Sequence, residues 1–266
     1  MTRPRIFIPR DSGALALGAD EVERAIAAAG HRRGLDIEIV RTGSRGLYWL
    51  EPMIEVATPH GRIAYGPVSD SDIESLFDAG WLDGNPHPLH LGRPEDIPFL
   101  KRQTRLVFAR CGIVDPLSLD DYRAHGGWRG LDRALTLGPA ETVEEVVTSG
   151  LRGRGGAGFP TGIKWRTVAG TAAAQKYIVC NADEGDSGTF ADRMIMEGDP
   201  FLLIEGMLIA GIAVGATKGY IYIRSEYPGA IETFRHAVAI ARAGHYLGSG
   251  ILGSAHAFDI EVRVGA

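Results

Sequence analysis

The sequence predicts an α/β protein in which a small N-terminal domain precedes a larger domain built on a largely parallel sheet. Short apolar runs typical of strands alternate with amphipathic helical segments along all 266 residues, a pattern that favours an α/β fold. Residues 83–98 contain four prolines and two glycines, and proline interrupts both helices and strands. We therefore expect one domain at residues 1–82, a linker at 83–98 and a second domain at 99–266.

The first domain is predicted to follow the order strand, helix, three strands, helix. Its first helix places Val22, Ile26 and Ala29 on one face and ends at Gly30, a residue suited to helix C-termini. The last helix follows a run of capping residues that begins at Ser69. In chain order we expect a strand at 5–9, a helix at 19–30, a strand at 35–40, a hairpin at 53–66 and a helix at 69–80.

This order, together with the stretch "TGSRGLYWLEPMIEV", resembles the thioredoxin-like ferredoxin fold. Members that hold a two-iron cluster carry cysteines in a GCxGxC-type loop, where this sequence has Ser44 and Tyr48. The earlier cysteine pair, near residues 11–17, is also missing. The chain has two cysteines, Cys111 and Cys180, too few for four thiolate ligands. We expect a thioredoxin-like domain without a cluster and no metal ligands.

Composition and charge narrow the function classes. The net charge of −5 disfavours nucleic-acid binding, which usually requires a basic face. The longest apolar run, residues 201–216, contains Glu205 and is shorter than a membrane span. His87 and His90 lie three residues apart in the linker but have no carboxylate or cysteine cluster beside them, so we expect exposed side chains there. With no secretory signal evident, we expect a cytoplasmic protein.

The second domain is predicted to be helical at first and then to alternate strands with helices. A capping box is expected to begin one helix, with Thr142 as N-cap and Glu145 three residues later, and Pro200 is expected at the first position of another. We expect helices at 99–112, on both sides of a Gly-Gly break within 117–135, and at 142–150, 200–216 and 229–244. Strands are expected at 176–186, 219–224 and 258–266, which gives a largely parallel sheet.

The stretch "GLRGRGGAGFPTGIKW", residues 150–165, combines glycine, positive charge and aromatic rings. Gly153, Gly155 and Gly158 fit G-x-G-x-x-G, although the stretch follows a helix rather than the strand of a standard dinucleotide turn. Glycines let backbone N–H groups approach an anion closely. The flanking charges are Arg152, Arg154 and Lys164, and the flat side chains are Phe159 and Trp165. We interpret the stretch as a cradle for a flat anionic ligand; a purely structural loop is the alternative.

The strand after this loop ends in polar side chains: Asn181, Asp183, Glu184 and Asp186. Ligands of open α/β sheets sit at the carboxyl ends of strands, and carboxylates accept hydrogen bonds from sugar hydroxyls. The alternative is a solvated acidic turn. A single site is therefore predicted in which phosphates contact the glycine loop and hydroxyls contact the acids.

At these residues the sequence resembles a known family. "GLRGRGGAGFPTGIKW", "CNADEGDSGTFADR", "GDPFLLIEGMLIAG" and "YIYIRSEYP" occur in order and resemble the NADH-oxidising flavoprotein subunit of respiratory complex I. The same subunit type occurs in NAD-linked hydrogenases and formate dehydrogenases. The resemblance covers residues 98–266, and the cluster-free N-terminus with "DYRAHGGWRGL" looks most like the β subunit of NAD-dependent formate dehydrogenase.

The resemblance implies an NAD-dependent diaphorase that binds FMN and NAD(H) in one cleft, with hydride passing between the two cofactors and no catalytic side chain. It implies single-electron transfer to iron–sulfur partners: a thioredoxin-like 2Fe–2S subunit and a molybdenum or tungsten formate dehydrogenase subunit. The FMN contacts it implies are Gly153, Arg154, Gly155, Lys164, Asn181, Asp183 and Glu184, and the NAD contacts are Gly156, Phe159 and Asp186.

Two features depart from the family. Thr167 stands where some members have an aromatic residue near the adenine. The family also continues with further FMN contacts and a four-cysteine 4Fe–4S motif, whereas this sequence ends at Gly265-Ala266, so we expect a partial flavin site. Alternatives are a complex I or hydrogenase flavoprotein and a non-catalytic docking fragment. An unrelated kinase-like nucleotide binder ranks last because the G-x-x-x-x-G-K-[ST] pattern is missing.

Overall fold

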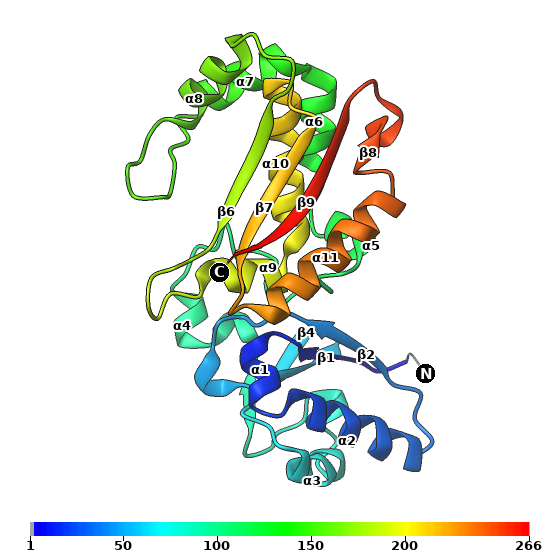
Figure 1. The fold of residues 1–266 in the computed structure, drawn as a ribbon. Helices are drawn as coiled ribbons and strands as arrows, with labels where there is room; N and C mark the ends of the chain where they lie inside the picture. Colours follow the sequence, from blue (N-terminus) through cyan, green and yellow to red (C-terminus); the bar gives the residue numbers. More distant parts are fainter. Residues whose placement is uncertain (1–2, 266) are drawn as a thin grey trace. The chain divides into compact units, whose positions relative to one another are not determined.

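The computed structural model describes residues 3–265 and divides into two compact units (Figure 1). Unit 1 comprises Met1–Pro116 with Glu197–Asp199, and unit 2 comprises Leu117–Met196 with Pro200–Ala266. Unit 1 thus continues past the proline-rich segment expected to be a linker. The division into domains at 1–82 and 99–266 stays a prediction, and Ala266 lies outside the described residues.

Unit 1 is built on a five-stranded sheet in the order β2-β1-β3-β4-β5. β1 and β2 are parallel, and the other neighbours are antiparallel. The expected thioredoxin-like order of strand, helix, three strands and helix is confirmed. The strands are β1 (Arg5–Pro9), β2 (Glu38–Thr42), β3 (Ile54–Thr58), β4 (Gly61–Tyr65) and β5 (His90–Gly92), and the helices are α1 (Ser12–Ala16), α2 (Ala19–Arg32), α3 (Ile73–Asp78) and α4 (Pro98–Lys101).

The core of unit 1 follows the predicted periodicity. Val22, Ile26 and Ala29 of α2 are all buried, and they pack in one cluster with apolar residues of β1, β3 and β4. The expected capping box before α3 is present, formed by Ser69 and Asp72. Burial of one apolar face therefore accounts for the arrangement of this unit.

The prediction of a helix over residues 99–112 is wrong. α4 ends at Lys101, and the chain then forms turns in which Ala109, Cys111 and Ile113 donate backbone hydrogen bonds to carbonyls three residues earlier. Gly112 has φ +80°, and a Cβ there would lie 2.3 Å from Cγ of Arg45. A positive φ interrupts an α-helix, so close packing against Arg45 replaces the helix.

Unit 2 is built on a four-stranded sheet in the order β6-β7-β9-β8. β6 (Tyr177–Ala182), β7 (Lys218–Arg224) and β9 (Ala257–Gly265) are parallel, whereas β8 (Gly248–Ser249) is antiparallel to β9. The expected largely parallel sheet is confirmed. The helices are α5 (Leu119–Ala124), α6 (Arg129–Leu137), α7 (Pro139–Thr148), α8 (Thr161–Gly170), α9 (Ala191–Gly198), α10 (Pro200–Val214) and α11 (Pro228–Ala243).

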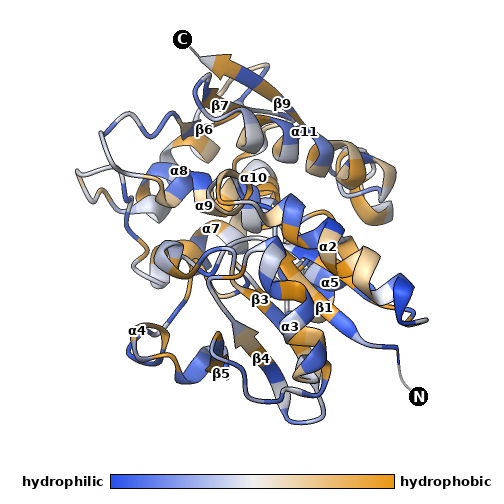
Figure 2. Ribbon diagram, turned by 90° about the horizontal axis from the view of Figure 1, so that it is seen from below, coloured by the Kyte–Doolittle hydropathy of each residue, from blue (hydrophilic) through white to orange (hydrophobic). Residues whose placement is uncertain are grey.

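Helix α10 forms the centre of the core of unit 2. It begins at Pro200 as predicted, is mainly hydrophobic along its length (Figure 2) and contacts β6, β7 and β9. Its buried Glu205 accepts hydrogen bonds from the hydroxyl of Tyr122 (2.5 Å) and from the backbone N–H groups of Trp128 (2.9 Å) and Leu131 (3.0 Å). This carboxylate fixes the Gly-Gly break between α5 and α6 to the core.

The prediction that Thr142 is the N-cap of a capping box is wrong, because α7 begins three residues earlier, at Pro139. Proline suits the first helical turn, where its missing N–H is not needed. Thr142 is buried within the helix and donates to the carbonyl of Gly138 (2.7 Å), while Glu145 pairs with Arg133 (2.7 Å). Among residues 3–265, no helix has both the length and the hydropathy needed to cross a lipid bilayer.

Candidate functional site

The glycine-rich stretch forms a narrow loop between α7 and α8. Gly153 N–H donates to the carbonyl of Phe159 (2.8 Å), and Thr161 N–H donates to the carbonyl of Leu151 (2.8 Å). Arg152 and Pro160 form an antiparallel bridge across the neck. Residues 154–158 therefore make up the tip of a closed loop with a defined base.

At the tip of the loop, backbone N–H groups and positively charged side chains are accessible to a ligand. A Cβ at Gly155 or Gly156 would meet no atom within 4 Å, and Gly156 has φ +99°. Arg154 and Lys164 are exposed, and their side chains form no hydrogen bond or ion pair with any residue from 3 to 265. Phe159 is 50% exposed. The loop therefore offers open backbone, two uncommitted cations and one exposed ring.

Close helix packing fixes the position of Lys164. Gly162 is buried, and a Cβ at this position would lie 2.5 Å from both the N and the Cα of Val147, so α8 approaches α7 at a distance that only glycine allows. Trp165 packs partly buried against the core of unit 2. It is therefore less available to a ligand than the sequence suggested, and Phe159 is the more exposed of the two predicted flat side chains.

The predicted polar residues lie together at the carboxyl end of β6. Ile178, Cys180 and Ala182 face the core, whereas Tyr177, Val179 and Asn181 alternate with them and are exposed. The side chain of Asn181 accepts a hydrogen bond from the N–H of Asp183 (3.1 Å). The carboxylate of Asp183 forms no hydrogen bond or ion pair within residues 3–265. Asp183 is therefore available as an acceptor.

Glu184 has a different environment from Asp183. Its carboxylate accepts hydrogen bonds from the N–H groups of Asp192 (2.6 Å) and Arg193 (3.1 Å), at the start of α9. The residue has φ +46°. Burial, followed by the negative charge of Glu184, raises the pKa of Asp192. Glu184 thus anchors the loop to the N-terminus of α9, where a negative charge is favourable.

Two residues that the sequence reasoning did not assign, one at the end of β7 and one just before α11, hold this loop. Arg224, at the carboxyl end of β7, donates to the backbone carbonyl of Glu184 (2.9 Å), and the hydroxyl of Tyr227 donates to the Glu184 carboxylate (3.1 Å). Burial, with the charge of Glu184 and this hydrogen bond, raises the pKa of Tyr227. Both residues belong to the quoted motif "YIYIRSEYP", which runs across the carboxyl end of β7, and this position is the signal that would have assigned them.

The two groups of predicted residues lie on two separate loops on the same side of the sheet (Figure 1). β6 is the outer strand, and the loop from α7 to α8 and the loop from β6 to α9 both project beyond it (Figure 1). Among residues 3–265, no hydrogen bond or ion pair joins Gly153–Lys164 to Asn181–Asp186. The predicted contacts of these residues with FMN and NAD stay predictions.

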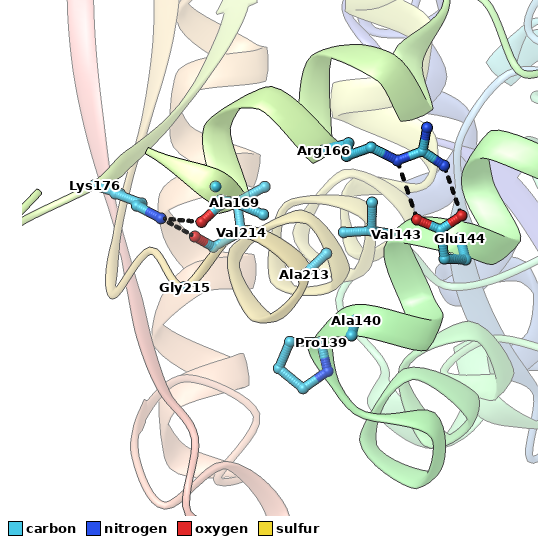
Figure 3. Close-up of a pocket in the computed structure, with 11 residues that line it drawn as sticks. Pro139, Ala140, Val143, Glu144, Arg166, Ala169, Lys176, Ala213, Val214 and Gly215 are labelled. Atoms are coloured by element: carbon cyan, nitrogen blue, oxygen red, sulfur yellow. Dashed lines mark hydrogen bonds and ion pairs between the residues drawn. The ribbon is translucent and has the colours of Figure 1, made fainter. Parts of the chain in front are cut away.

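A cavity of about 510 Å³ lies elsewhere in unit 2, near the amino end of β6. Its walls include Val143, Val214 and the ion pair of Arg166 with Glu144 (2.6 Å), and Lys176 donates to the carbonyls of Ala169 (2.9 Å) and Val214 (3.0 Å) (Figure 3). None of the predicted FMN or NAD residues lines it. Carboxyl ends of strands are the usual ligand sites of such sheets, so we do not assign the flavin to this cavity.

Potential metal ligands are dispersed in the described part of the chain. No group of three or more His, Cys, Asp or Glu side chains between residues 3 and 265 could hold a metal ion. Ser44, at a position expected for a cluster cysteine, instead donates to Glu51 (2.6 Å). Burial raises the pKa of the Cys111 thiol to about 12 and that of the Cys180 thiol to about 11. Both cysteines are therefore neutral thiols at pH 7.

Comparison with known proteins finds similar sequences over the part of the chain that contains these motifs. Residues 146–266 match the family described as the Nuo51 FMN-binding domain. The NADP-reducing hydrogenase subunit HndC of Solidesulfovibrio fructosivorans is 54% identical over 166 residues, which cover 62% of this chain and 34% of the relative. One NADH-quinone oxidoreductase subunit of Rhizobium meliloti is 52% identical over 155 residues, 58% of this chain and 37% of the relative.

A solved structure, the NAD+-reducing [NiFe]-hydrogenase in the H2-reduced state, aligns with all of this chain and 43% of its own, with a TM-score of 0.47 and 23% identity. The chain spans about a third of the length of the curated relatives named above. The family match contains the loop from α7 to α8, β6 and its acidic end, and the motif after β7. Residues 146–266 are therefore similar to the Nuo51 FMN-binding domain family.

Proposed function

We propose that this chain is part of a diaphorase subunit that holds FMN and NAD(H) in one site and supports hydride exchange between them. The observation that carries the proposal is the pairing of two features at the β6 edge. One is a closed glycine loop whose cations Arg154 and Lys164 form no hydrogen bond or ion pair with the described residues. The other is an acidic loop in which the Asp183 carboxylate accepts no hydrogen bond from them. The family match supports the choice of FMN.

The glycine loop fits a phosphate group. The open space at Gly155 and Gly156 lets backbone N–H groups approach phosphate oxygens, as in other anion-binding loops. Lys164 lies in the first turn of α8, an element fixed by the contact of Gly162 with Val147. We assign Gly153, Arg154, Gly155 and Lys164 to the FMN phosphate, because a cation without a counter-ion is stabilised by an anionic ligand.

The acidic loop fits the hydroxyl-bearing part of the flavin. Asn181 and Asp183 would accept hydrogen bonds from ribityl hydroxyls, while Glu184 keeps the loop in place through α9 and Tyr227. We assign the NAD(H) side of the site to Gly156, Phe159 and Asp186, all of which are exposed. The exposed ring of Phe159 would cover a flat heterocycle and exclude water from it.

Bound FMN would supply the redox chemistry, which is the exchange of hydride with the nicotinamide ring of NAD(H). The protein residues supply binding and orientation. Arg154 and Lys164 would hold the FMN phosphate by their charge and so keep the cofactor in a fixed position. No side chain is required as a general acid or base.

Two measurements on the purified protein test the proposal. FMN is titrated into it while quenching of flavin fluorescence is followed, and NADH-dependent ferricyanide reduction is then measured on the loaded protein. Saturable binding with NADH-dependent turnover supports the proposal. Absence of FMN binding would leave the alternative role, a non-catalytic docking fragment. FMN binding without NADH turnover would locate the flavin here and remove NAD(H) from the assignment.

We further propose NAD-dependent formate dehydrogenase as the assembly, with a thioredoxin-like 2Fe–2S subunit and a molybdenum or tungsten subunit as partners in the cytoplasm. The support is an N-terminal unit that lacks the cluster cysteines, together with its resemblance to the formate dehydrogenase β subunit. The alternative, a complex I or hydrogenase flavoprotein, has support from the names of the relatives. Purifying the native assembly and comparing formate, hydrogen and quinone as electron partners for NAD(H) separates the two.

A further inference from the structure

Unit 1 contains a cavity of about 360 Å³ that none of the proposed flavin residues lines. Its charged walls are Arg45, Lys101 and Arg105 on the positive side and Glu95 and Asp96 on the negative side. A water molecule occupies about 30 Å³ of liquid volume, so the cavity can hold a small solute together with several waters. The charges on its walls determine which kind of solute can bind there.

Arg105 is the unusual residue in this cavity. Its Nε atom is buried and has no hydrogen-bond partner, and its side chain forms no hydrogen bond or ion pair with any residue from 3 to 265. Buried donors in folded proteins are nearly always paired. The ring of Phe108 lies 5.9 Å from the guanidinium carbon and provides no acceptor for the buried N–H.

The surroundings do not neutralise the charge of Arg105. Burial lowers the pKa of Arg105, and the positive charge of Arg45 lowers it further. Cys111 is the group that opposes this effect, but the pKa of its thiol is raised to about 12. The thiol is therefore neutral at pH 7 and provides no negative charge. Arg105 remains a partly buried cation without a counter-ion among the described residues.

The carboxylates near the cavity already have cations of their own. Glu55 is shared by Arg45 (2.9 Å, Nη2 to Oε2) and Arg62 (3.3 Å). Asp199 pairs with Arg110 (2.9 Å). At the rim, Lys101 lies 3.6 Å from Asp96, and Arg93 lies 3.8 Å from Glu95. Arg105 is the cation in this group that has no carboxylate partner of its own.

We propose that this cavity is a binding site for a small phosphate-type oxyanion, either free phosphate or the phosphate group of a small hydroxylated ester. The planar guanidinium of Arg105 would bind two oxygens of the anion, which is the geometry in which arginine binds phosphate most strongly. Arg45 adds positive charge from a fixed position, because both its Nε and its Nη2 are held by Glu55. Glu95 and Asp96 would accept hydrogen bonds from hydroxyl groups of an ester.

The test uses the 266-residue chain and isothermal titration calorimetry in a chloride buffer, with inorganic phosphate as the first probe and glycerol 3-phosphate as the second. One saturable site is expected. Arg105→Gln should weaken binding by about ten- to hundredfold, the range for loss of a hydrogen bond to a charged group. A lower Kd for glycerol 3-phosphate than for phosphate identifies the phosphate ester as the ligand class. A lower Kd for phosphate identifies the free ion.

Two controls locate the site. Arg102→Gln changes an exposed arginine whose Nε donates to the carbonyl of Pro98 (3.0 Å) outside the cavity, and binding should be unchanged. Lys164→Ala, in the glycine loop, should also leave this site intact, which separates it from any anion bound at the proposed flavin site. Binding that survives Arg105→Gln but is lost in Lys164→Ala would overturn the proposal, as would the absence of saturable binding to the unaltered chain.

Thermal unfolding distinguishes the loss of a binding site from the misfolding of a variant. Phosphate should raise the Tm of the unaltered chain and of Arg102→Gln, but not that of Arg105→Gln. If circular dichroism shows that Arg105→Gln is unfolded, Arg105→Lys replaces it. Lysine retains the charge without the planar fork, so binding should weaken but remain saturable. Unaltered affinity in Arg105→Lys and an equal Tm shift in Arg105→Gln would each contradict the assignment.

Discussion

The buried carboxyl group of Glu51 predicts a pH-dependent stability of unit 1. Glu51 is 4% exposed, and its two oxygens accept hydrogen bonds from the Ser44 hydroxyl (2.6 Å) and the N–H of Met53 (2.8 Å). Burial, assisted by the negative charge of Asp11, raises its pKa from 4.5 to about 7. Between pH 4.5 and about 7, Glu51 is therefore mostly protonated in the folded protein and mostly ionised in the unfolded chain.

The sign follows from proton linkage. A pKa that is higher in the folded state contributes stability that is fully present below the unfolded value, 4.5, and is lost as the pH rises through about 7. The two values differ by about 2.5, and about 1.4 kcal/mol per pKa unit gives about 3–4 kcal/mol over the whole titration. Stability measured at pH 8 should thus lack a contribution of this order that is present at pH 5.

The perturbation is Glu51→Gln, which cannot ionise but retains an oxygen to accept the Met53 N–H. The assay is urea unfolding between pH 5 and pH 8, followed by tryptophan fluorescence and circular dichroism. The unaltered chain should lose about 2–3 kcal/mol more over this range than the variant, because part of the full difference falls below pH 5. The matched control is Glu74→Gln. Glu74 is exposed and paired with Arg32 and Arg33, which lower its pKa, so its substitution should not change the slope.

Two results would refute this reasoning. One is parallel pH profiles for the unaltered chain and Glu51→Gln. The other is a direct carbon-13 NMR titration in which the Glu51 carboxyl ionises near 4.5, the value for an unperturbed side chain. Either result would mean that the Ser44 and Met53 hydrogen bonds outweigh burial, since both bonds favour the charged form.

Three further predictions concern unit 2. Lys164→Ala should weaken FMN binding by about tenfold or more, because it removes a charged hydrogen-bond donor; unchanged flavin content after gel filtration would contradict its role. Asp183→Ala should weaken FMN binding through loss of a hydroxyl acceptor, whereas an unaltered titration would assign the acceptor to another residue. Gly162→Ala should cost about 1–3 kcal/mol of unfolding free energy, because its Cβ would lie 2.5 Å from the backbone of Val147. Equal urea midpoints for Gly162→Ala and the unaltered chain would show that α7 and α8 separate without cost.

Elements whose signal is the periodicity of buried residues could be predicted from the sequence. The buried face of α2 and the start of α10 at Pro200 were both correct, because each depends on residues that are close together in the chain. The parallel order of β6, β7 and β9 followed from the alternation of strands with helices. These predictions needed no knowledge of long-range contacts.

The incorrect predictions arose where a second constraint competes with the local pattern. Thr142 and Glu145 have the spacing of a capping box, but Pro139 offers an earlier helix start, and Thr142 is buried as a result. Residues 99–112 have a composition suited to a helix, yet Gly112 takes a positive φ against Arg45, a residue 67 positions earlier in the chain. A contact of that kind has no counterpart in the local sequence.

The acidic stretch after β6 shows why residue type alone could not separate two roles at the candidate site. Asp183 and Glu184 are adjacent carboxylates, and the sequence assigned both to the flavin. In the structure Glu184 accepts two N–H groups of α9 and the Tyr227 hydroxyl, whereas Asp183 has no hydrogen-bond donor among the described residues. A carboxylate engaged by three donors has little capacity left for a ligand but holds its loop rigidly. We propose that the glutamate reduces the entropy that the loop would lose on binding, and that the neighbouring aspartate forms the contact with the ligand.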